Sequence, residues 1–584
     1  MGEEWMTGGA SSPRWSAGQS AAGLPGVQMG QGCRSQVLVA GQVRVAVVGD
    51  FLLVPGQDRA LLQAAAAARW VELTRLPGSY WVIAQTGTHT FVCGDLSGFR
   101  SIFHTVQGTQ TMWSTSARRL AQQADAAPDL AMMAARLVAG PEHWPDRTVY
   151  EGVRAVPPGF GLLLTGSKTD LVDVHAIDPT ATLAEGAPAF GDALQTAVRW
   201  RMLAAGGVAG ADLSGGLDSS TLAILAARDG RIRAVTYADG YTSHEDLLYA
   251  RRVAAHIGVD LQVGMGGTEH LPFGWSARQP LTDQPAAVSL TTAQHALYLR
   301  PAGKLPLHFT GNGGDVVLDS CSAAWVGMVQ TGDRRAARRQ VTGWARARNR
   351  SPRDLWRTVV RTAESTHAEA LRDAARRLAR ADIDSRRPGV WSWCHVGRSG
   401  TWLTAQGRDR VAALLLEAAG TTDAEARADL VEQRFSLRLI AADARDTVPL
   451  TAAWNVRQVH PFLDNQVVRA AYAIAPAERH GITTFKPLLA AAVPDLPAWL
   501  TGRTSKGSFT RQLTAGMLHH RPALAAAIRS SALVSCGLLD PQPALDALAG
   551  IDGTQAGSLY DLQRLVMACQ WLGAVEHRHQ GAAC

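Results

Sequence analysis

Residues 212–220, with the sequence DLSGGLDSS, limit the possible folds of this chain more than any other segment. They follow an apolar run at 208–213 that is typical of a buried strand, and an apolar stretch with helical spacing continues to residue 227. A strand that passes through a Ser/Gly turn directly into a helix is a building unit of mostly parallel sheets. The segment therefore predicts an α/β fold with helices on both faces of the sheet.

The same turn has the composition of an anion-binding loop. Paired glycines let backbone N–H groups close around an anion, the serines add hydroxyl donors, and the helix start adds its positive dipole end. The pattern matches neither the Walker A motif nor the dinucleotide motif. An aspartate in such a loop suggests a bound cation, so we predict that Asp218 is a Mg²⁺ ligand. The alternative is a plain Ser/Gly turn with a capping aspartate.

The rest of the chain shows two changes of pattern. Residues 1–35 are rich in Gly, Ser and Ala without apolar periodicity, which predicts a flexible leader outside the fold. Residues 36–180 carry short apolar runs at 37–39, 43–48, 80–84, 90–93 and 161–164, which predict a strand-rich domain. After a Pro/Ala-rich connector at 179–188, residues 189–584 form a second predicted domain.

In this second domain, strand-like and helix-like segments alternate. We predict strands at 208–213, 232–237 and 305–309, and helices at 219–227 and 244–257. An Ala/Arg/Leu-rich stretch from about 323 to 445 predicts a helical layer packed on the sheet. Its tryptophans, among them Trp391, Trp393 and Trp402, are either core residues or an amphipathic wall for a ligand.

Composition excludes several classes of protein. A hydrophobic fraction of 46% with 18% charged residues is typical of a globular enzyme and not of a disordered chain. The excess of 57 Lys+Arg over 50 Asp+Glu, a net charge of +7, is too mild to indicate nucleic acid binding. The seven cysteines form no C-x-x-C pair, which argues against structural zinc. No secretory signal or long apolar run is seen, so we expect a cytoplasmic protein without membrane contact.

Further segments follow the first loop in a characteristic order. They are TGNGGD at 310–315, PFLD at 461–464, FKPLL at 485–489 and RTSKG at 503–507, with GDLSGFR at 94–100 in the first domain. In this set and order the chain resembles the asparagine synthetase superfamily. The resemblance implies a degenerate αββα domain of the Ntn-amidotransferase type at 36–180. It also implies a PP-loop, α-hydrolase-like parallel sheet with a helical layer at 189–584.

The resemblance also implies the members of the site. ATP and Mg²⁺ are the expected cofactors, with Asp218 and Asp315 as metal ligands and Lys486 and Lys506 as catalytic residues that neutralise the leaving pyrophosphate. The implied nucleotide contacts are Leu213, Ser214, Gly215, Gly216, Asp218, Ser219, Ser220, Thr236, Tyr237, Gly311, Asn312, Gly313 and Asp315.

The chain departs from the family pattern at three places. Glutamine-dependent members have a cysteine directly after the initiator methionine, whereas this sequence begins Met-Gly-Glu and its first cysteine is Cys33, so we expect no glutaminase activity. Asparagine synthetases have a glutamate, and β-lactam synthetases a tyrosine, where this chain has Asn312. Arg457 stands where a glutamate usually precedes the PFLD segment. The adenylation apparatus is kept while the acceptor pocket is changed.

This combination is most similar to the lasso peptide cyclases, ligases of ribosomal peptide antibiotic (RiPP) biosynthesis. The resemblance implies that an Asp or Glu side chain of a leaderless core peptide is adenylated and that the peptide's N-terminal amine closes a macrolactam through an isopeptide bond. The implied partners are the precursor peptide, a leader-binding protein and a leader peptidase. The alternatives are a β-lactam or asparagine synthetase-like ligase acting on a small amino acid, a tRNA-modifying ATPase, and a nonenzymatic scaffold.

Overall fold

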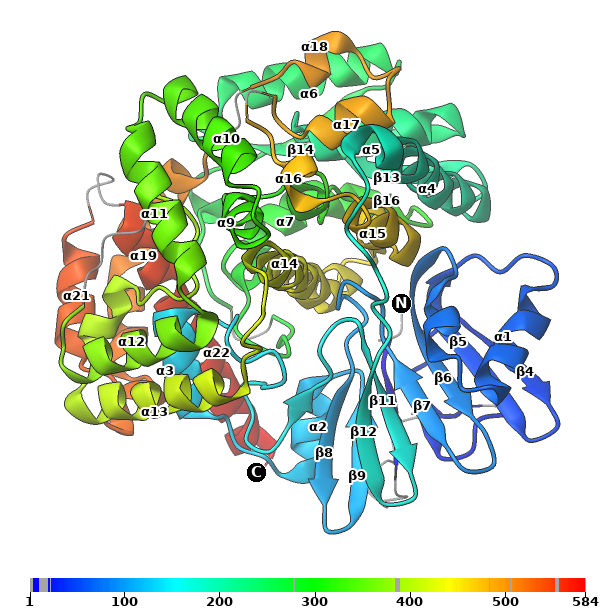
Figure 1. Ribbon diagram of the computed structural model, residues 1–584, viewed down its shortest axis with the longest axis horizontal. Coiled ribbons are helices and arrows are strands. Elements are labelled where there is room, and N and C mark those ends of the chain that lie inside the picture. Colours follow the sequence, from blue (N-terminus) through cyan, green and yellow to red (C-terminus); the bar gives the residue numbers. More distant parts are fainter. Residues whose placement is uncertain are drawn as a thin grey trace.

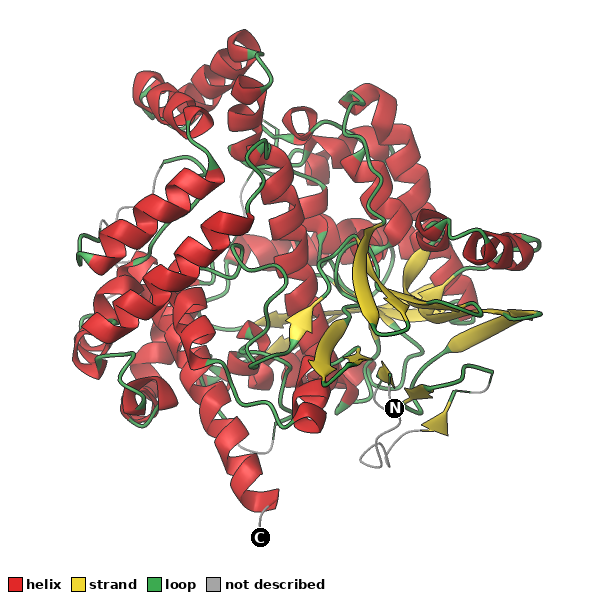
Figure 2. Cartoon of the chain, turned by 60° about the horizontal axis from the view of Figure 1, so that its bottom comes forward, coloured by secondary structure: helices red, strands yellow, loops and turns green. Residues whose placement is uncertain are grey.

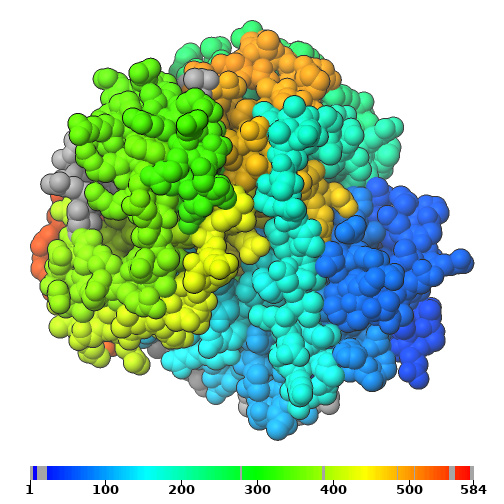
Figure 3. Space-filling model, in the orientation of Figure 1, coloured from blue at the N-terminus to red at the C-terminus, as the bar shows by residue number. Residues whose placement is uncertain are grey.

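The computed structural model describes residues 4–9, 19–21, 23–276, 279–383, 389–482, 484–504, 507–551 and 556–582. Within them, a strand-rich first part adjoins a larger second part in which helices surround a parallel sheet (Figure 1). The segment between β12 (Lys168–Asp173) and α4 (Leu183–Ala204) crosses one face of the molecule and links the two parts (Figure 3). The chain is a mixed α/β protein, which confirms the predicted class.

The first part contains two antiparallel sheets in the described residues. In sheet order, the first consists of β10 (Arg154–Ala155), β8 (Phe103–Gln107), β9 (Gln110–Ser114), β1 (Met6–Gly8), β3 (Val27–Met29) and β2 (Gln19–Ser20). The second consists of β12, β11 (Phe160–Thr165), β7 (Thr90–Cys93), β6 (Gly78–Gln85), β5 (Val43–Phe51) and β4 (Ser35–Ala40). The runs predicted as strands at 37–39, 43–48, 80–84, 90–93 and 161–164 all lie in this second sheet.

Strand β5 shows how these sheets pack. Successive side chains of a strand point to opposite faces, and both faces of β5 are buried. Val45 and Val47 pack with Leu61 of α1 (Gln57–Ala66), whereas Ala46 and Val48 belong to the cluster between the two sheets. The other described helices here are η1 (Trp70–Thr74), α2 (Ala117–Ala124) and α3 (Leu130–Ala139).

The predicted leader at 1–35 is wrong for the described residues of that stretch. Met6 is fully buried and pairs with Met29, and Thr7 pairs with Ser114 of β9. These strands are only two or three residues long, so their apolar content does not stand out from the surrounding Gly and Ser. They are stabilised by hydrogen bonds to a sheet whose other strands lie about a hundred residues later, which a local pattern cannot show.

The second part is built on a parallel sheet of order β15 (Leu261–Met265), β14 (Arg231–Ala238), β13 (Val208–Asp212), β16 (His308–Phe309) and β17 (Gln458–Val459). The chain runs from β13 outward to β14 and β15 and then returns to β16 on the other side of β13. The strand order therefore reverses between β13 and β16, and ligands of open α/β sheets bind outside the carboxyl ends of strands at such a point. Of the strand predicted at 305–309, only His308 and Phe309 are extended.

Helices surround this sheet (Figure 1). Figure 2 shows that helices also fill the side of the molecule away from the strands. Around the sheet lie α4, α5 (Leu217–Arg228), α6 (His244–His256), α7 (Thr292–Leu299), α8 (Gly314–Val317), α15 (Asn465–Tyr472), α16 (Pro476–Arg479), α17 (Pro487–Ala492) and α18 (Ala498–Thr501). The predicted layer at 323–445 contains α9 (Ala323–Gln330), α10 (Arg334–Ala347), α11 (Pro352–Glu364), α12 (His367–Ala379), α13 (Ala405–Thr421) and α14 (Ala428–Ala452).

The second part contains further helices in its described residues. They are α19 (Thr510–Arg529), α20 (Ala532–Ser535), α21 (Pro541–Ala549) and α22 (Ala556–Ala582), with short 3₁₀ turns at Thr268–His270, Ala287–Leu290, Arg300–Ala302, Arg398–Trp402 and Pro461–Leu463. Among the residues described, no helix combines the length and the apolarity needed to cross a bilayer.

The predicted connector at 179–188 ends earlier than its composition suggests. Helix α4 starts at Leu183 and contains Pro188. Thr182 and Glu185 form a capping box, in which each side chain bonds the other residue's backbone N–H. Phe190 and Leu194 are fully buried in the core of the second part. Capping and burial therefore outweigh the proline, which lacks only one hydrogen bond near the helix start.

The tryptophans of the helical layer are core residues. Trp393 and Trp402 are 4% and 1% exposed, and the Trp393 indole donates to the carbonyl oxygens of Thr362 and Ser365. Trp391 packs edge-on against Trp393 with 4.9 Å between ring centroids. The structure therefore favours the packing role over the wall of a ligand site.

A buried polar network joins the two parts of the chain. The backbone N–H of Leu96, in the GDLSGFR segment, donates to the Asn465 side chain at 2.9 Å. Arg201 of α4 binds Asp464 of the PFLD segment through two hydrogen bonds of 2.9 and 2.6 Å, and both side chains are almost completely buried. Arg457 pairs with Asp50 of β5. The two sequence segments therefore meet at the interface between the parts.

A histidine pair connects the first part to the helical layer and makes stability depend on pH. Nδ1 of His143 lies 3.0 Å from Nε2 of His367, whose ring stacks on Trp393. Burial lowers the pKa of His143 to about 3 and that of His367 to about 4. Unfolded histidine takes up its proton near pH 6.5. The stability that comes from keeping these rings neutral is therefore present above about pH 6.5 and is lost as the pH falls toward about 4.

We expect the free energy of unfolding to decrease between pH 6.5 and pH 4.5 by up to about 1.4 kcal/mol per pH unit for each histidine. His367→Gln removes one titrating ring and should make this decrease shallower in urea unfolding measured at several pH values. His256→Gln, at an exposed position at the end of α6, is the control and should keep the parent slope. An unchanged slope in His367→Gln would contradict the assignment.

Candidate functional site

The candidate site lies at the reversal of strand order, where two loops leave neighbouring strands. Residues 213–216 follow β13, and residues 310–313 follow β16. Both loops lead into helices, α5 and α8. The structure therefore brings together two segments that are about a hundred residues apart in the sequence.

The first loop is held closed by its own serines. The Ser214 N–H donates to Oγ of Ser219 at 3.3 Å, the two hydroxyl oxygens lie 3.0 Å apart, and the Gly216 N–H donates to Oγ of Ser214 at 3.3 Å. Gly215 has a φ of +81°, and a Cβ there would lie 2.2 Å from the Asp246 carbonyl oxygen. Only glycine fits this position.

The start of α5 carries the predicted nucleotide contacts, which differ in accessibility. Gly216 is the N-cap without a side-chain hydrogen bond to the first turn, so the positive end of the helix faces the loop. Leu213 and Ser220 are both fully buried, and Leu213 donates its N–H to the Val235 carbonyl. Their side chains therefore lie behind the loop, whereas Ser214 is exposed and Gly216 is partly exposed.

The second loop packs tightly on the first. A Cβ on Gly311 would lie 2.8 Å from the Ser219 nitrogen, and one on Gly314 would lie 2.4 Å from Cγ of Asp218. The Asn312 N–H donates to Oγ1 of Thr310 at 3.3 Å, and that oxygen lies 2.7 Å from Nδ1 of His460. Gly313 has a φ of +95° and begins α8. Glycines in this loop thus permit the contact that places Asp315 near Asp218.

Lys486 lies between these two aspartates. Its ammonium nitrogen is 2.5 Å from both carboxylate oxygens of Asp218 and 2.8 Å from Oδ1 of Asp315. The lysine side chain is 2% exposed, and its backbone has a left-handed φ of +53° at the start of α17. Burial by itself would lower the pKa of Lys486, but the two carboxylates outweigh it and raise this pKa. Lys486 is therefore a charged lysine in an acidic pocket.

These residues fit a magnesium–nucleotide. Mg²⁺ in nucleotide sites is usually held by one or two carboxylates together with phosphate oxygens, not by a cage of protein ligands. Asp218 and Asp315 supply such a pair, since both carboxylates contact the Lys486 ammonium group. Among the described residues, no group of three or more His, Cys, Asp or Glu side chains forms a larger metal site.

The second predicted lysine, Lys506, lies outside the described residues, but its segment contributes a neighbour that the sequence analysis did not single out. Arg503 is 3% exposed at its side chain, donates to the Gly215 carbonyl oxygen at 2.5 Å and pairs with Asp246. Its guanidinium lies over the Tyr249 ring, 4.4 Å from the centroid. Arg503 therefore holds the first loop against α6. In the sequence, only the position of Arg503 in the RTSKG segment pointed to a place near the site.

A cavity of about 800 Å³ opens beside the carboxyl ends of β14 and β15. Asp239, Tyr241 and residues 266–268 line one side, and α19 lines the other with residues such as Thr510 and Leu518. The volume is in the range of small-molecule pockets, about 300–1,000 Å³. The cavity lies close to the predicted contact Tyr237, because the Tyr237 hydroxyl donates to Asp239 at 3.0 Å.

The two predicted contacts on β14 differ in environment. Thr236 is 7% exposed within the strand. Burial and the neighbouring Asp239 carboxylate raise the pKa of Tyr237, so its phenol stays protonated. A further pair missed by the sequence analysis lies under the first loop, where the buried His308 ring is 2.8 Å from Oδ1 of Asp212. Neither partner lies in a motif that points to the other.

Comparison with known proteins gives one extensive match. The family model described as asparagine synthase matches residues 189–573, more than half of the chain. No curated protein sequence matches.

Similar solved structures include the allosteric regulatory enzyme of purine biosynthesis, at 13% identity over 41% of this chain and 63% of the other, with a TM-score of 0.18. The chain thus spans less than two thirds of that enzyme. Another is the glutamine phosphoribosylpyrophosphate amidotransferase from B. subtilis complexed with ADP and GMP, at 11% identity over 40% of this chain and 73% of the other, also with a TM-score of 0.18. At these scores the similarity supports no conclusion about fold or function.

Proposed function

Because the chain belongs to the asparagine synthase family, and hence to the ATP-dependent amide-forming enzymes, we propose that it is a lasso peptide cyclase. In this proposal it adenylates an Asp or Glu side chain of a leaderless core peptide and releases pyrophosphate. The peptide's N-terminal amine then attacks the acyl carbon, AMP leaves, and an isopeptide bond closes the macrolactam.

The main support for an adenylating function is that Lys486 contacts both Asp218 and Asp315 at the reversal of strand order. Two carboxylates and a cation from distant segments gather beside a loop that offers backbone N–H groups and serine hydroxyls. Such an arrangement suits a triphosphate better than any neutral ligand.

Each group then has a proposed role. The loop at 214–219 binds phosphate oxygens, and Asp218 and Asp315 hold Mg²⁺. The metal, when bound, neutralises charge on the phosphates. Lys486 moves from the aspartates to the leaving pyrophosphate, whose negative charge it stabilises. Lys506 is proposed to neutralise the same leaving group and the oxyanion formed when the amine attacks.

The acceptor side supports a peptide amine in place of a small amino acid. Arg457 pairs with Asp50 of the first part, and Asn312 offers only an amide, so neither supplies a carboxylate or phenol as base. An α-amine has a pKa of about 7.7–8.0, so part of it is neutral at neutral pH without a strong base. Holding the folded peptide with its amine near the acyl carbon would supply much of the rate.

The remaining features suggest how the peptide reaches the site. We propose that the first part is a degenerate Ntn-amidotransferase-like domain kept as a scaffold, because its GDLSGFR segment binds Asn465, the residue directly after the PFLD segment. The cavity of about 800 Å³ is large enough for a segment of the peptide. A leader-binding protein and a leader peptidase in the cytoplasm would supply the free amine.

The competing function is amide formation on a small acid, which the asparagine synthase description itself favours. To distinguish the two, the protein is incubated with ATP, Mg²⁺ and either the core peptide of a neighbouring precursor gene or aspartate with ammonium. We expect AMP, pyrophosphate and a product lighter than the peptide by one water in mass spectrometry. The N-acetylated peptide should support pyrophosphate exchange without that product. AMP release that depends only on aspartate would overturn the proposal.

A further inference from the structure

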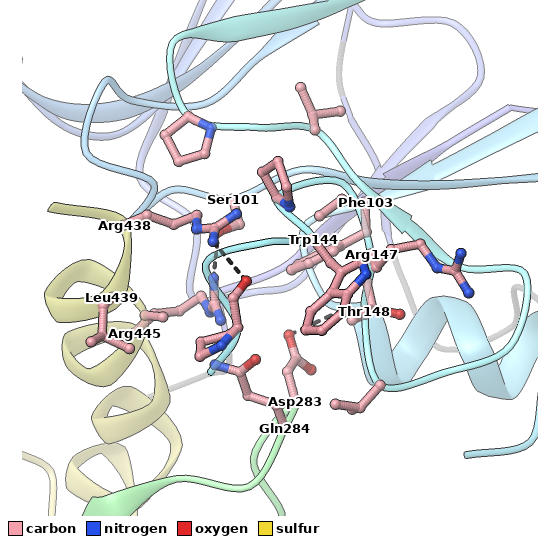
Figure 4. Close-up of a pocket in the computed structure, with 18 of the residues that line it drawn as sticks. Ser101, Phe103, Trp144, Arg147, Thr148, Asp283, Gln284, Arg438, Leu439 and Arg445 are labelled. Carbon is pink, nitrogen blue, oxygen red and sulfur yellow. Dashed lines mark hydrogen bonds between the residues drawn. The ribbon is translucent and has the colours of Figure 1, made fainter. Parts of the chain in front are cut away.

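A second cavity, of about 90 Å³, lies where the first part of the chain meets α14 (Figure 4). Phe103, Trp144 and Phe435 provide apolar walls. The volume exceeds the roughly 30 Å³ that one water takes in the liquid, so the cavity admits a small ion with several oxygens. None of its lining residues belongs to the candidate nucleotide site.

The lining of this cavity is strongly cationic. Four arginines contribute to it: Arg136, Arg147, Arg438 and Arg445. Figure 4 shows Arg438 and Arg445 reaching from α14 toward Trp144 and the segment with Asp283. Asp283 is the carboxylate of the lining, and it caps the start of α2 by accepting from the Ser116 hydroxyl at 2.7 Å and from the backbone N–H groups of residues 117 and 118. Its oxygens therefore bind the start of α2, and one carboxylate faces four arginines in the lining.

Two of the four arginines have acidic partners. Arg147 lies 3.4 Å from Asp129 and 3.0 Å from Glu417. Arg445 lies 3.7 Å from Asp446 and donates to the Ser101 hydroxyl. Burial raises the pKa of Asp446 to about 7, so this partner is only partly ionised at neutral pH.

The other two arginines bind neutral groups only. Arg136 donates to the Gln284 side chain at 3.4 Å and to the Arg147 carbonyl at 2.6 Å. Arg438 donates to the Pro141 carbonyl at 2.9 Å. Within the described part of the chain, neither forms an ion pair with a carboxylate.

The carboxylates near these two arginines therefore balance their charges only in part. Burial lowers the pKa of Arg136 and of Arg438 to about 10 each, and the charge of Arg438 adds to the effect on Arg136. Asp129 acts in the opposite direction on Arg136, as do Glu142 and Asp146 on Arg438, but burial outweighs these carboxylates. The Nε atoms of Arg136 and Arg445 are buried without a hydrogen-bond partner. A charge that is partly removed from water and only partly balanced by counter-charges costs free energy, and a buried donor without an acceptor adds to that cost.

We propose that this cavity binds a small oxyanion of the phosphate class, with at least two negative charges, between Arg136, Arg438 and Arg445. Guanidinium groups bind phosphate oxygens through paired hydrogen bonds, and a multiply charged anion compensates several cations at once. Arg136 belongs to α3 in the first part, whereas Arg438 and Arg445 belong to α14. The bound anion would therefore link the two parts of the chain, independently of the proposed activity.

The test uses inorganic phosphate on the full chain, with sodium chloride at the same ionic strength as reference. We expect phosphate to raise the unfolding temperature of the parent and sodium acetate to leave it unchanged. Arg438→Gln and Arg136→Gln should each weaken phosphate binding at least tenfold in calorimetric titration. Arg434→Gln, an exposed position on the same helix, should bind as the parent does.

Two further readouts distinguish an anion site in this cavity from a purely structural arginine cluster and from phosphate bound in the nucleotide loop. Without phosphate, Arg438→Gln should unfold at the parent temperature or above, since it removes a partly buried charge that forms no ion pair among the described residues. A purely structural arginine would give a lower temperature. Ser214→Ala, which changes the phosphate loop of the nucleotide site, should keep the phosphate effect.

The proposal is overturned if folded Arg438→Gln and Arg136→Gln bind phosphate as the parent does. It is also overturned if the phosphate effect disappears in Ser214→Ala, because the anion would then sit in the nucleotide loop. Equal stabilisation by acetate would contradict the requirement for a multiply charged anion.

Discussion

Asp218→Asn should lower the rate of adenylation by about a thousandfold, the size expected when one electrostatic contact to a transition state is removed. Asparagine keeps the size of the side chain but removes the charge that faces Lys486 and Asp315. With only Asp315 left, the site would hold Mg²⁺ poorly and would leave Lys486 with one anionic partner. The rate is measured as pyrophosphate release in a single turnover with the core peptide.

The control for this variant is Asp495→Asn, because Asp495 pairs with Arg228 at the surface and is 61% exposed at its side chain. It should react at the parent rate. Circular dichroism and the unfolding temperature show whether Asp218→Asn is folded. A folded variant that keeps more than a tenth of the parent rate would remove Asp218 from the mechanism, whatever the peptide substrate proves to be.

Arg201→Met should destabilise the chain by about 3–5 kcal/mol, the usual cost of leaving one member of a buried ion pair alone. Arg201 and Asp464 are 2% and 1% exposed and share two hydrogen bonds, and the Ala197 carbonyl accepts a third from the arginine. Removing the guanidinium leaves the Asp464 carboxylate buried in the core of the second part. The loss is measured as the change in free energy of unfolding in urea.

A double-mutant cycle tests the cause. Arg201→Met with Asp464→Leu removes both charges and should cost less than the sum of the two single changes, because no unpaired ion remains. Arg199→Met lies on the same helix with a side chain that is 72% exposed, and it should change stability by less than about 0.5 kcal/mol. If the losses of unfolding free energy in the cycle are additive, the two side chains have no interaction energy, which would contradict this prediction.

Local features of the fold were predictable where hydrogen bonds and burial follow a short period. The run at 208–213, the turn and the helix after it were predicted from neighbours within a few positions, and β13 and α5 confirm them. The same holds for the strands of the second sheet of the first part. The prediction failed for Met6 and Thr7, whose strand is three residues long and depends on partners in β3 and β9.

For the candidate site, the sequence predicted a set of residues but not their arrangement. Its lysine and aspartates were identified from motif order, yet Lys486 meets Asp218 across 268 positions of sequence. Arg457 was interpreted as part of the acceptor pocket, whereas it pairs with Asp50 from the first part. Arg503 binds the Gly215 carbonyl oxygen. Nothing in the sequence pointed to this contact except the position of Arg503 in the RTSKG segment.

The amino-acid sequence alone therefore determined the strand–turn–helix unit at residues 212–220, the alternation of strands and helices, and the family resemblance, since each depends on side-chain types at fixed short spacings. The tertiary structure alone decided which charges meet: Lys486 with two aspartates, Arg201 with Asp464, and Arg136 with the other arginines of the cavity at the contact between the two parts. Backbone hydrogen bonds and periodic burial are local properties of a chain. The pairing of charges is not, because it depends on which distant segments the folded core brings within a few ångströms.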